Sequence, residues 1–419
     1  MNDSDRPHVL IVNQHGENRG DESAMRAMID GLESALGPAR YTIVVQFRDT
    51  SLVVPFRESV TLLHLRMPLI EMAGLFAFGA LRCIGISLRM LLTSRTRRIV
   101  AAYESADLVI SAPGGPYFGD IYADHEIVHW FYVWLATVYR KKLFLYAPSA
   151  GPFRIGWLNL VRRRLFPRFD VLCVREAISA AYLTALLGDG SEIHVTADSA
   201  IQQRIEPCRR DDYFRDERGS LAARTLVAVS AIEYRFPGEA DPASMQLRYD
   251  DALTQCLRHL AASKQCHFLF IPQLYGAAHD DAPYLRRLAA QLPAGTSWEL
   301  VDPALDSNMQ RAIFGMADLC IASRYHPQIF AASAGVPGIC IYYEHKALGF
   351  MNLLGLEEFA FDIRAPNATA MCQKLDEVLA RRDALARQIE ERMPALRARS
   401  RQTTEMAVAL YRGSRAEPS

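Results

Sequence analysis

The sequence predicts two doubly wound, Rossmann-like α/β domains that face each other across a cleft, followed by a C-terminal helix. Three observations lead to this fold class. The chain has 419 residues, more than the roughly 100–200 of a usual single domain. Apolar runs rich in β-branched residues alternate with helical patterns along most of it. A polar stretch at 202–224 contains few apolar residues and separates two series of such runs.

The apolar runs have the near-continuous hydrophobicity of strands that are buried on both faces. Helical patterns lie between them and supply the crossovers that parallel strands require. In the first half we expect strands at 8–13, 41–47, 106–113, 143–148, 171–175 and 193–198. In the second half we expect them at 225–232, 267–273, 298–302, 319–323, 338–343 and 359–363. The predicted domains are therefore 1–205 and 222–365.

Residues 366–419 predict a helical tail, because the pattern there is helical and heavily charged, as in DEVLARRDALARQIEERM. We expect one apolar stripe of this tail to pack across both domains.

Composition excludes some classes of protein. Lys+Arg and Asp+Glu both number 47, so the net charge is zero, which argues against a protein that coats nucleic acid. The eight cysteines form no CxxC pair and read as reduced thiols rather than as a disulfide framework or a zinc site. The first residues run into an apolar strand without a signal-peptide pattern. We therefore expect a cytoplasmic protein.

The stretch 68–98, PLIEMAGLFAFGALRCIGISLRMLLTSRTRR, has two interpretations. Glu71, Arg82 and Arg89 break it into apolar runs shorter than the roughly 20 residues that a membrane span requires. The favoured interpretation is a buried helix of the first domain. The alternative is an amphipathic helix on the inner face of a membrane, with the basic end at 95–98 toward anionic lipid.

In open α/β sheets a ligand binds beyond the carboxyl ends of the strands, so the residues that follow each strand are the first candidates. The first strand is followed by NQHGENRGDESAM, which fits neither GxxxxGK[ST] nor GxGxxG. Gly20 allows a tight turn, and Asp21 opens a helix. Asp21 either caps that helix or binds a sugar hydroxyl and moves its proton.

Other strand ends offer further candidates. Gly114 and Gly115 follow the third strand and allow the backbone close to a ligand, and Asp120 reaches toward the cleft unless the stretch is an ordinary turn. Arg175 ends the fifth strand, as a cleft residue or as part of an Arg–Glu surface pair. Asp198 ends the sixth, as a ligand to the substrate or as a helix cap.

The sequence HEIVH at 125–129 satisfies HExxH, in which two histidines bind zinc and the glutamate acts as a base. However, the next residues, WFYVW, suit core packing, and no third ligand follows at the required spacing. We predict no metal site here.

The stretch SRYHPQIFAASAGVP from Ser323 gives the clearest signal. Arg324 presents a planar fork that suits a carboxylate or phosphate. Pro327 fits the first turn of a helix, which places Tyr325 and His326 at a helix N-terminus that favours an anion. After the next strand, Glu344 and Lys346 add a carboxylate and a cation to the same rim.

The order of these motifs resembles the polysaccharide pyruvyl transferase family. The matching motifs are NRGD at 18–21, the glycine loop at 114–120, AGP at 150–152, RxxxS at 175–179, Asp198, SRYH at 323–326, GVP at 335–337 and YxxK at 343–346 with Phe350. The resemblance implies a two-domain fold of the GT-B type and transfer of an enolpyruvyl unit from phosphoenolpyruvate to a sugar. It also implies that Arg324 and His326 bind phosphoenolpyruvate and that Arg175 is functional.

The hypothesis that follows is formation of a pyruvate ketal on a cell-surface saccharide or its precursor, which would be lipid-linked, with release of phosphate. Arg324 and Arg175 hold the anion, and His326 binds phosphate or acts as the acid. Asp21 is the base or a hydroxyl ligand, with Asp198 and Glu344 behind it. In this hypothesis the domain at 1–205 is the acceptor side and the domain at 222–365 is the donor side. No cofactor is needed.

Three alternatives remain. A GT-B glycosyltransferase for a nucleotide sugar would carry a carboxylate on the helix after its phosphate loop, but that helix reads QIFAASAG here. A non-catalytic member of a polysaccharide assembly complex would use 68–98 as an anchor. A zinc hydrolase would use the HExxH motif.

Overall fold

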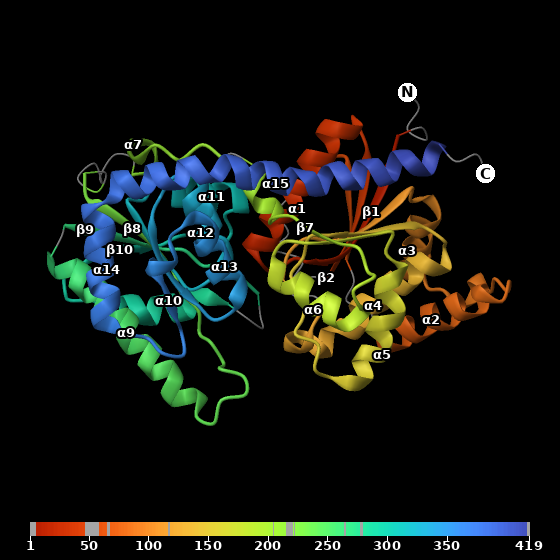
Figure 1. Cartoon of the computed structure of the whole chain (residues 1–419), viewed down its shortest axis with the longest axis horizontal. Helices are drawn as coiled ribbons and strands as arrows, with labels where there is room; N and C mark the ends of the chain where they lie inside the picture. The colour runs from red at the N-terminus through yellow and green to blue at the C-terminus, as the bar shows by residue number, and fades with distance from the viewer. Residues whose placement is uncertain are drawn as a thin grey trace. The chain divides into compact units, whose positions relative to one another are not determined.

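The computed structural model describes residues 6–46, 58–64, 68–115, 118–203, 205–214, 221, 223–263, 265–276 and 280–416. The chain forms two compact units. The first comprises Met1–Glu17, Asp21–Gln202 and Arg397–Ser419, and the second comprises Asn18–Gly20 and Gln203–Leu396. Each unit has its own parallel sheet with helices on both faces (Figure 1).

Among the described residues, the first unit holds a seven-stranded sheet in the order β3-β2-β1-β4-β5-β6-β7, with all neighbours parallel. Its strands are β1 (His8–His15), β2 (Arg40–Gln46), β3 (Val60–His64), β4 (Leu108–Ser111), β5 (Lys142–Tyr146), β6 (Val171–Val174) and β7 (Ile193–Val195). Its helices include α1 (Arg19–Leu36), α2 (Leu69–Cys83), α3 (Ser94–Ser105), α4 (Ala123–Val138), α5 (Gly156–Leu165) and α6 (Ala177–Leu187). The strand order changes direction between β1 and β4, as in a doubly wound fold.

Alternate strand residues of this sheet build two separate cores, because successive side chains point to opposite faces. On one face, residues such as Leu10 and Val109 pack with side chains from α2 to α6. On the other face, residues such as Ile11 and Ile110 pack with α1 and with the end of α15 (Arg382–Ala416), which contributes Val408 among others.

In the part of the second unit that the structure describes, a six-stranded parallel sheet has the order β10-β9-β8-β11-β12-β13. The strands are β8 (Thr225–Ser230), β9 (Cys266–Phe270), β10 (Ser297–Leu300), β11 (Leu319–Ala322), β12 (Gly338–Tyr342) and β13 (Ala360–Asp362). The helices include α9 (Pro242–Ser263), α10 (Asp281–Ala289), α11 (Ser307–Gly315), α12 (Tyr325–Ser333), α13 (His345–Leu354) and α14 (Ala368–Ala380). Several of these helices are capped at their N-terminus by a side chain. At α11, for example, the Asp306 carboxylate accepts a hydrogen bond from the Met309 amide at 2.8 Å.

The predicted fold class of two doubly wound parallel sheets is confirmed, and each expected strand overlaps an observed one. β3 was not predicted. The predicted linker at 202–224 contains a short helix, α7 (Arg210–Tyr213), and several of its residues lie outside the described part. The assignment of the units to an acceptor and a donor side stays a prediction.

The charged C-terminal segment forms α14 and the 35-residue helix α15. Up to Leu396, α15 belongs to the second unit, where Gln388 Nε2 donates to the carbonyls of Leu354 and Gly355 at 3.0 and 2.8 Å. From Arg397 it belongs to the first unit, where Thr404 Oγ1 lies 2.5 Å from Tyr146 OH.

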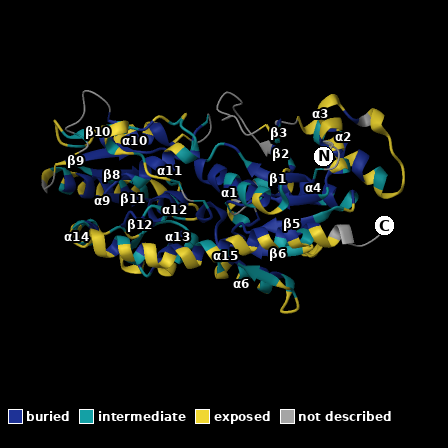
Figure 2. Ribbon diagram, turned by 90° about the horizontal axis from the view of Figure 1, so that it is seen from above, coloured by how far each residue is buried: buried dark blue, intermediate teal, exposed yellow. Residues whose placement is uncertain are grey.

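The stretch 68–98 differs from the buried helix that the sequence favoured. Leu75, Phe78 and Gly79 of α2 are buried, but Leu69 and Ile70 are at least 80% exposed. Figure 2 shows exposed residues along this part of the first unit. One side of α2 is therefore buried in the first unit, and the other side exposes apolar side chains to solvent.

Candidate functional site

The N-terminus of α12 brings together the strongest of the predicted site residues. β11 is buried along its length, and Arg324 follows it in an extended conformation as the residue before the helix. Ser323 Oγ lies 2.6 Å from Tyr249 OH, which fixes the turn between strand and helix. Tyr325 and His326 then lie in the first helical turn, where the backbone amides and the helix dipole favour an anion.

Arg324 is held by a carboxylate that the sequence did not identify. Its Nε and Nη2 donate to the two oxygens of Asp281 at 2.8 and 2.6 Å. Asp281 Oδ2 also accepts from the backbone amides of Gln273 and Leu274 at 3.0 and 2.9 Å. These bonds fix the plane of the guanidinium and engage its Nε edge, so an incoming anion meets the Nη1 side or displaces Asp281.

His326 packs against the start of α1, where Asn18 and the first two helical residues, Arg19 and Gly20, belong to the second unit. A Cβ added to Gly20 would lie 1.9 Å from His326 Nδ1, so only glycine fits against the imidazole. Asn18 Oδ1 accepts from the Gly20 amide at 2.8 Å, and the Arg19 amide donates to the Gln273 carbonyl at 3.0 Å. The structure therefore brings two predicted residues, Gly20 and His326, into contact.

Replacing Gly20 with alanine is expected to lower activity strongly, because the new methyl group must displace the His326 ring. The measurement is steady-state kinetics beside a thermal unfolding curve. Gly349→Ala is the matched control, since a Cβ at that position in α13 meets nothing within 4 Å. Helix propensity predicts that this control stabilises the protein by about 0.5–1 kcal/mol and leaves activity unchanged. Equal activity of the two variants would contradict the close packing.

The other predicted residues of the second unit lie on and after β12. Lys346 Nζ lies 2.5 Å from Glu344 Oε2 and 5.8 Å from the centre of the Tyr325 ring. This places Glu344, Lys346 and Tyr325 in one group. Burial raises the pKa of the neighbouring Tyr343, and the nearby Glu344 carboxylate raises it further. The Tyr343 phenol is therefore neutral at ordinary pH.

In the first unit, Arg175 and Asp198 form a buried ion pair. Arg175 Nη1 lies 2.5 Å from Asp198 Oδ2, and Arg175 Nε donates to Ser149 Oγ at 2.8 Å. Asp198 Oδ1 also accepts from the Ala200 amide at 2.8 Å and caps a short 3-10 helix. The two residues predicted at separate strand ends are thus partners, and neither is a surface group.

Asp120 lies in a different network, together with the glutamate of the HExxH motif. Arg162 is fully buried and donates to Asp120 Oδ1 at 2.9 Å and to Glu126 Oε1 and Oε2 at 2.8 and 2.5 Å. Trp130 Nε1 also donates to Glu126 at 2.9 Å, and the Arg154 amide donates to Asp120. Both oxygens of each carboxylate are therefore engaged, so the motif reads as core packing here.

The remaining predicted residues of the first unit follow β1 and β4. Asp21 is buried in the first turn of α1, and its carbonyl accepts from Gln14 Nε2 at 3.4 Å. The carbonyl of Gly114 accepts from the Ser149 amide at 3.4 Å, and Gly115 is half-buried beside it. Ser149 also accepts from Arg175, so the glycine loop and the Arg175–Asp198 pair share a neighbour.

Sequence reasoning missed residues around these groups. His15 Nε2, at the end of β1, lies 3.0 Å from Nε2 of His129, the second histidine of the motif. Arg19 Cζ lies 3.9 Å from the centre of the Tyr275 ring. The first position was visible as a polar residue after a strand, but nothing in the sequence indicated its partner 114 positions away.

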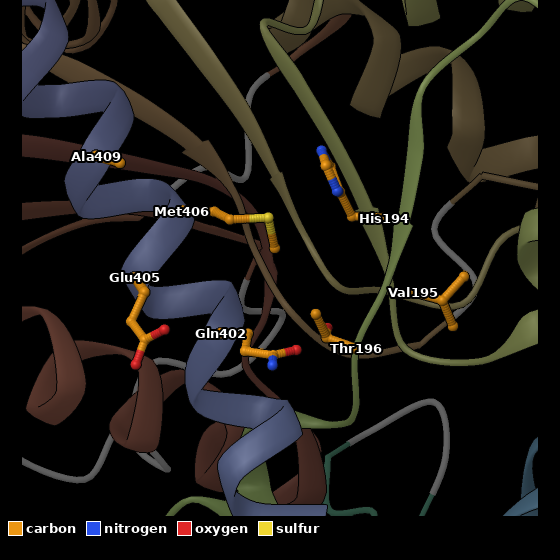
Figure 3. Close-up of a pocket in the computed structure, with 7 residues that line it drawn as sticks. All are labelled: His194, Val195, Thr196, Gln402, Glu405, Met406 and Ala409. Atoms are coloured by element: carbon orange, nitrogen blue, oxygen red, sulfur yellow. The ribbon is translucent and has the colours of Figure 1, made fainter.

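A pocket of about 430 Å³ lies elsewhere in the first unit, between β7 and α15 (Figure 3). It is lined by His194, Val195, Thr196, Gln402, Glu405, Met406 and Ala409. None of the predicted site residues lines it, and we assign it no role in catalysis.

Two solved structures resemble the fold of this chain. MnaA of S. aureus, solved with UDP, has a TM-score of 0.60 to this chain at 12% identity and covers 99% of each chain. HepE of Anabaena, solved with UDP and glucose, has a TM-score of 0.57 at 14% identity and covers 98% of this chain and 100% of that chain. At these identities the likeness shows the two-domain GT-B-like fold alone.

Sequence comparison goes further. The amylovoran biosynthesis protein AmsJ of Erwinia amylovora is 22% identical over 401 residues, which cover 91% of this chain and 94% of AmsJ. The family model described as polysaccharide pyruvyl transferase matches residues 18–345. The match covers the sequence from NRGD to His345 and includes the end of β11 and the N-terminus of α12. The expected resemblance is therefore confirmed: this chain is an enzyme of the polysaccharide pyruvyl transferase family.

Proposed function

We propose that this enzyme transfers the pyruvyl group of phosphoenolpyruvate to a saccharide and forms a pyruvate ketal with release of phosphate. The observation that carries the proposal is the group at the start of α12. There Arg324, His326 and the first-turn amides converge at the end of a buried strand, with the Gly20 backbone against the imidazole. Such a group suits a small, dense anion.

The chemistry needs an acid, a base and positive charge. A proton added to the methylene carbon gives C2 oxocarbenium character, and a sugar hydroxyl then forms a bond to C2. The C2–O bond to phosphate breaks, and a second hydroxyl of the sugar closes the ketal. One hydroxyl proton replaces the proton that the acid gave to the methylene group, and the other leaves with phosphate. The balance needs no further reactant.

The proposed roles follow from the contacts. Arg324 stabilises the negative charge of the donor, in the orientation that Asp281 sets. His326 binds the phosphate or protonates the methylene carbon, with the Tyr325 ring beside it and Lys346 over the Tyr325 ring. Anion binding is also the role proposed for Arg175, although its partner Asp198 offsets part of its charge.

The acceptor is proposed to bind the first unit. Asp21 is the proposed base or hydroxyl ligand, since it is buried at the start of α1 after the first strand. Gly114 and Gly115 let the backbone approach the sugar. Asp120 is proposed only to position neighbouring groups, because Arg162 and the Arg154 amide already donate hydrogen bonds to its carboxylate.

The enzyme is proposed to act in the cytoplasm, at the inner face of the membrane, on a lipid-linked precursor. Among the described residues, no helix is both long and apolar enough to cross a bilayer.

The test is release of phosphate from phosphoenolpyruvate by the full chain in the presence of lipid-linked or nucleotide-linked saccharides. We expect release that depends on a saccharide acceptor, and a product whose mass has gained one pyruvate ketal. Thermal unfolding distinguishes the glycosyltransferase alternative: stabilisation by UDP or GDP but not by phosphoenolpyruvate would overturn the proposal. Phosphate release with none of the acceptors would favour the non-catalytic alternative.

A further inference from the structure

The outer side of α2 and of the residues that follow it exposes large apolar side chains to solvent. Leu69, Ile70 and Met90 are each at least 80% exposed. The exposed apolar residues of this segment are Leu69, Ile70, Phe76, Ile84, Ile86, Leu88 and Met90. So many in one stretch of 22 residues exceed the scattered single apolar side chains that are normal on a protein surface.

The inner side of the same helix fixes this orientation. Leu75 and Phe78 belong to the core under the sheet, and α2 packs on α4. A Cβ on Gly79 would lie 2.6 Å from the Trp134 ring. Phe76, at the margin between the two sides, is 55% exposed, and its ring lies 4.9 Å from that of Trp134. The helix therefore presents its other side outward, as its place at the edge of the first unit in Figure 1 shows.

The charge of the segment has one sign. Between Glu71 and Glu104 the sequence contains no Asp or Glu but five arginines, at 82, 89, 95, 97 and 98. Arg89 pairs with Glu104 at 2.8 Å and Arg95 with Glu71 at 3.4 Å, whereas Arg97 and Arg98 extend the exposed basic surface of α3. An apolar surface flanked by arginines has the composition of a helix that lies on anionic lipid.

A second helix of the same layer repeats the pattern. α5 contacts α4, and its Val161 packs on the core that also holds α2. Trp157 and Leu160 of α5 are 59% and 66% exposed, and Arg163 and Arg164 follow them on the surface. The sequence has no Asp or Glu between positions 126 and 170. Tryptophan beside arginine is the residue pair typical of a membrane interface.

We propose that the outer sides of α2, the residues through Met90, and α5 form a docking surface for the headgroup region of an anionic bilayer. The charge decides between this occupant and a second copy of the chain. A second copy would bring its own arginines against these arginines, whereas anionic lipid headgroups neutralise them. The surface would bring the enzyme to a lipid-linked acceptor, and in that respect the inference rests on the proposed function.

The test is sedimentation of the full chain with vesicles, without substrates. We expect binding to phosphatidylglycerol–phosphatidylcholine vesicles that weakens as salt is added, and little binding to phosphatidylcholine alone. Ile70→Ser with Met90→Ser should weaken binding about tenfold, because both side chains would enter the interface. The control is Leu247→Ser with Met309→Ser, two exposed apolar residues of the second unit, which should bind like the wild type.

Charge is tested in the same way. Arg97→Glu with Arg98→Glu should abolish the preference for anionic vesicles, and Arg387→Glu with Arg401→Glu on α15 should preserve it. Equal binding by all variants, or equal binding to both vesicle types, would overturn the inference. The inference would also be overturned if the wild type formed a concentration-dependent dimer that the variant with Ile70→Ser and Met90→Ser no longer formed. Phosphate release with a soluble acceptor is measured separately, so failure of the docking surface and failure of the proposed reaction give different results.

Discussion

Replacement of Arg324 by alanine is expected to lower kcat/KM for phosphoenolpyruvate by about 100- to 1,000-fold, the usual cost of removing one group that stabilises transition-state charge. Arg324 is the residue directly before α12, and its hydrogen bonds to Asp281 hold the guanidinium in one orientation. The measurement is phosphate release at varied phosphoenolpyruvate concentration. Arg364→Ala is a matched control, because Arg364 forms a half-exposed ion pair with Glu239 in the same unit.

Loss of Arg324 also leaves the Asp281 carboxylate without its counterion, so a stability measurement must accompany the kinetics. The variant Arg324→Ala, Asp281→Ala removes both charges and should recover stability without recovering activity. Asp281→Asn keeps Arg324 but loosens its orientation, and we expect a smaller loss that appears mainly in KM. Near-normal kcat/KM for folded Arg324→Ala would refute the role in anion binding.

Replacement of Arg162 by methionine is expected to destabilise the enzyme by about 3–5 kcal/mol, because it leaves a buried carboxylate without its partner. Arg162 and Glu126 are both fully buried, and their closest atoms lie 2.5 Å apart. Urea unfolding followed by circular dichroism measures the change. Adding Glu126→Gln to the variant should restore part of the loss, since the uncompensated charge is then removed as well.

The neighbouring Arg163 provides the control for this prediction. It is exposed and donates one hydrogen bond to the Leu186 carbonyl at 3.1 Å, so Arg163→Met should cost about 1 kcal/mol or less. If Arg162→Met and Arg163→Met unfold at the same urea concentration, the buried network does not stabilise the fold as described. The same result would reopen the catalytic interpretation of HExxH, which the engagement of Glu126 argues against.

The strands of both sheets were predictable because parallel strands buried on both faces need continuous apolar runs, and such runs are easy to see. β1, β8 and β11 are examples. β3 was missed because this short strand, VTLLH, lies at an edge of the sheet, where Val60 and Leu62 are only partly buried and Thr61 is exposed. The exposure of α2 was misjudged for a related reason: hydrophobicity alone does not say whether a neighbouring element covers both sides of a helix.

The candidate site divides in the same way. Positions at the ends of strands were predictable from the strand pattern, and the structure brings His326 and Gly20 together. Their role in binding a ligand stays a prediction. Partners far apart in sequence were not predictable. Asp281, for example, lies 43 residues before Arg324 in the chain. Side-chain pairing of this kind depends on tertiary structure, which no local pattern encodes.

The composition of the first unit has a consequence for synthesis on the ribosome. The sheet face that carries Ile11 and Ile110 is completed by Ala407, Val408 and Tyr411 of α15. These residues are translated after the whole of Gln203–Leu396. The N-terminal sheet of the nascent chain therefore stays partly uncovered until the second unit has been synthesised, so the first unit completes its core only after the second has been translated.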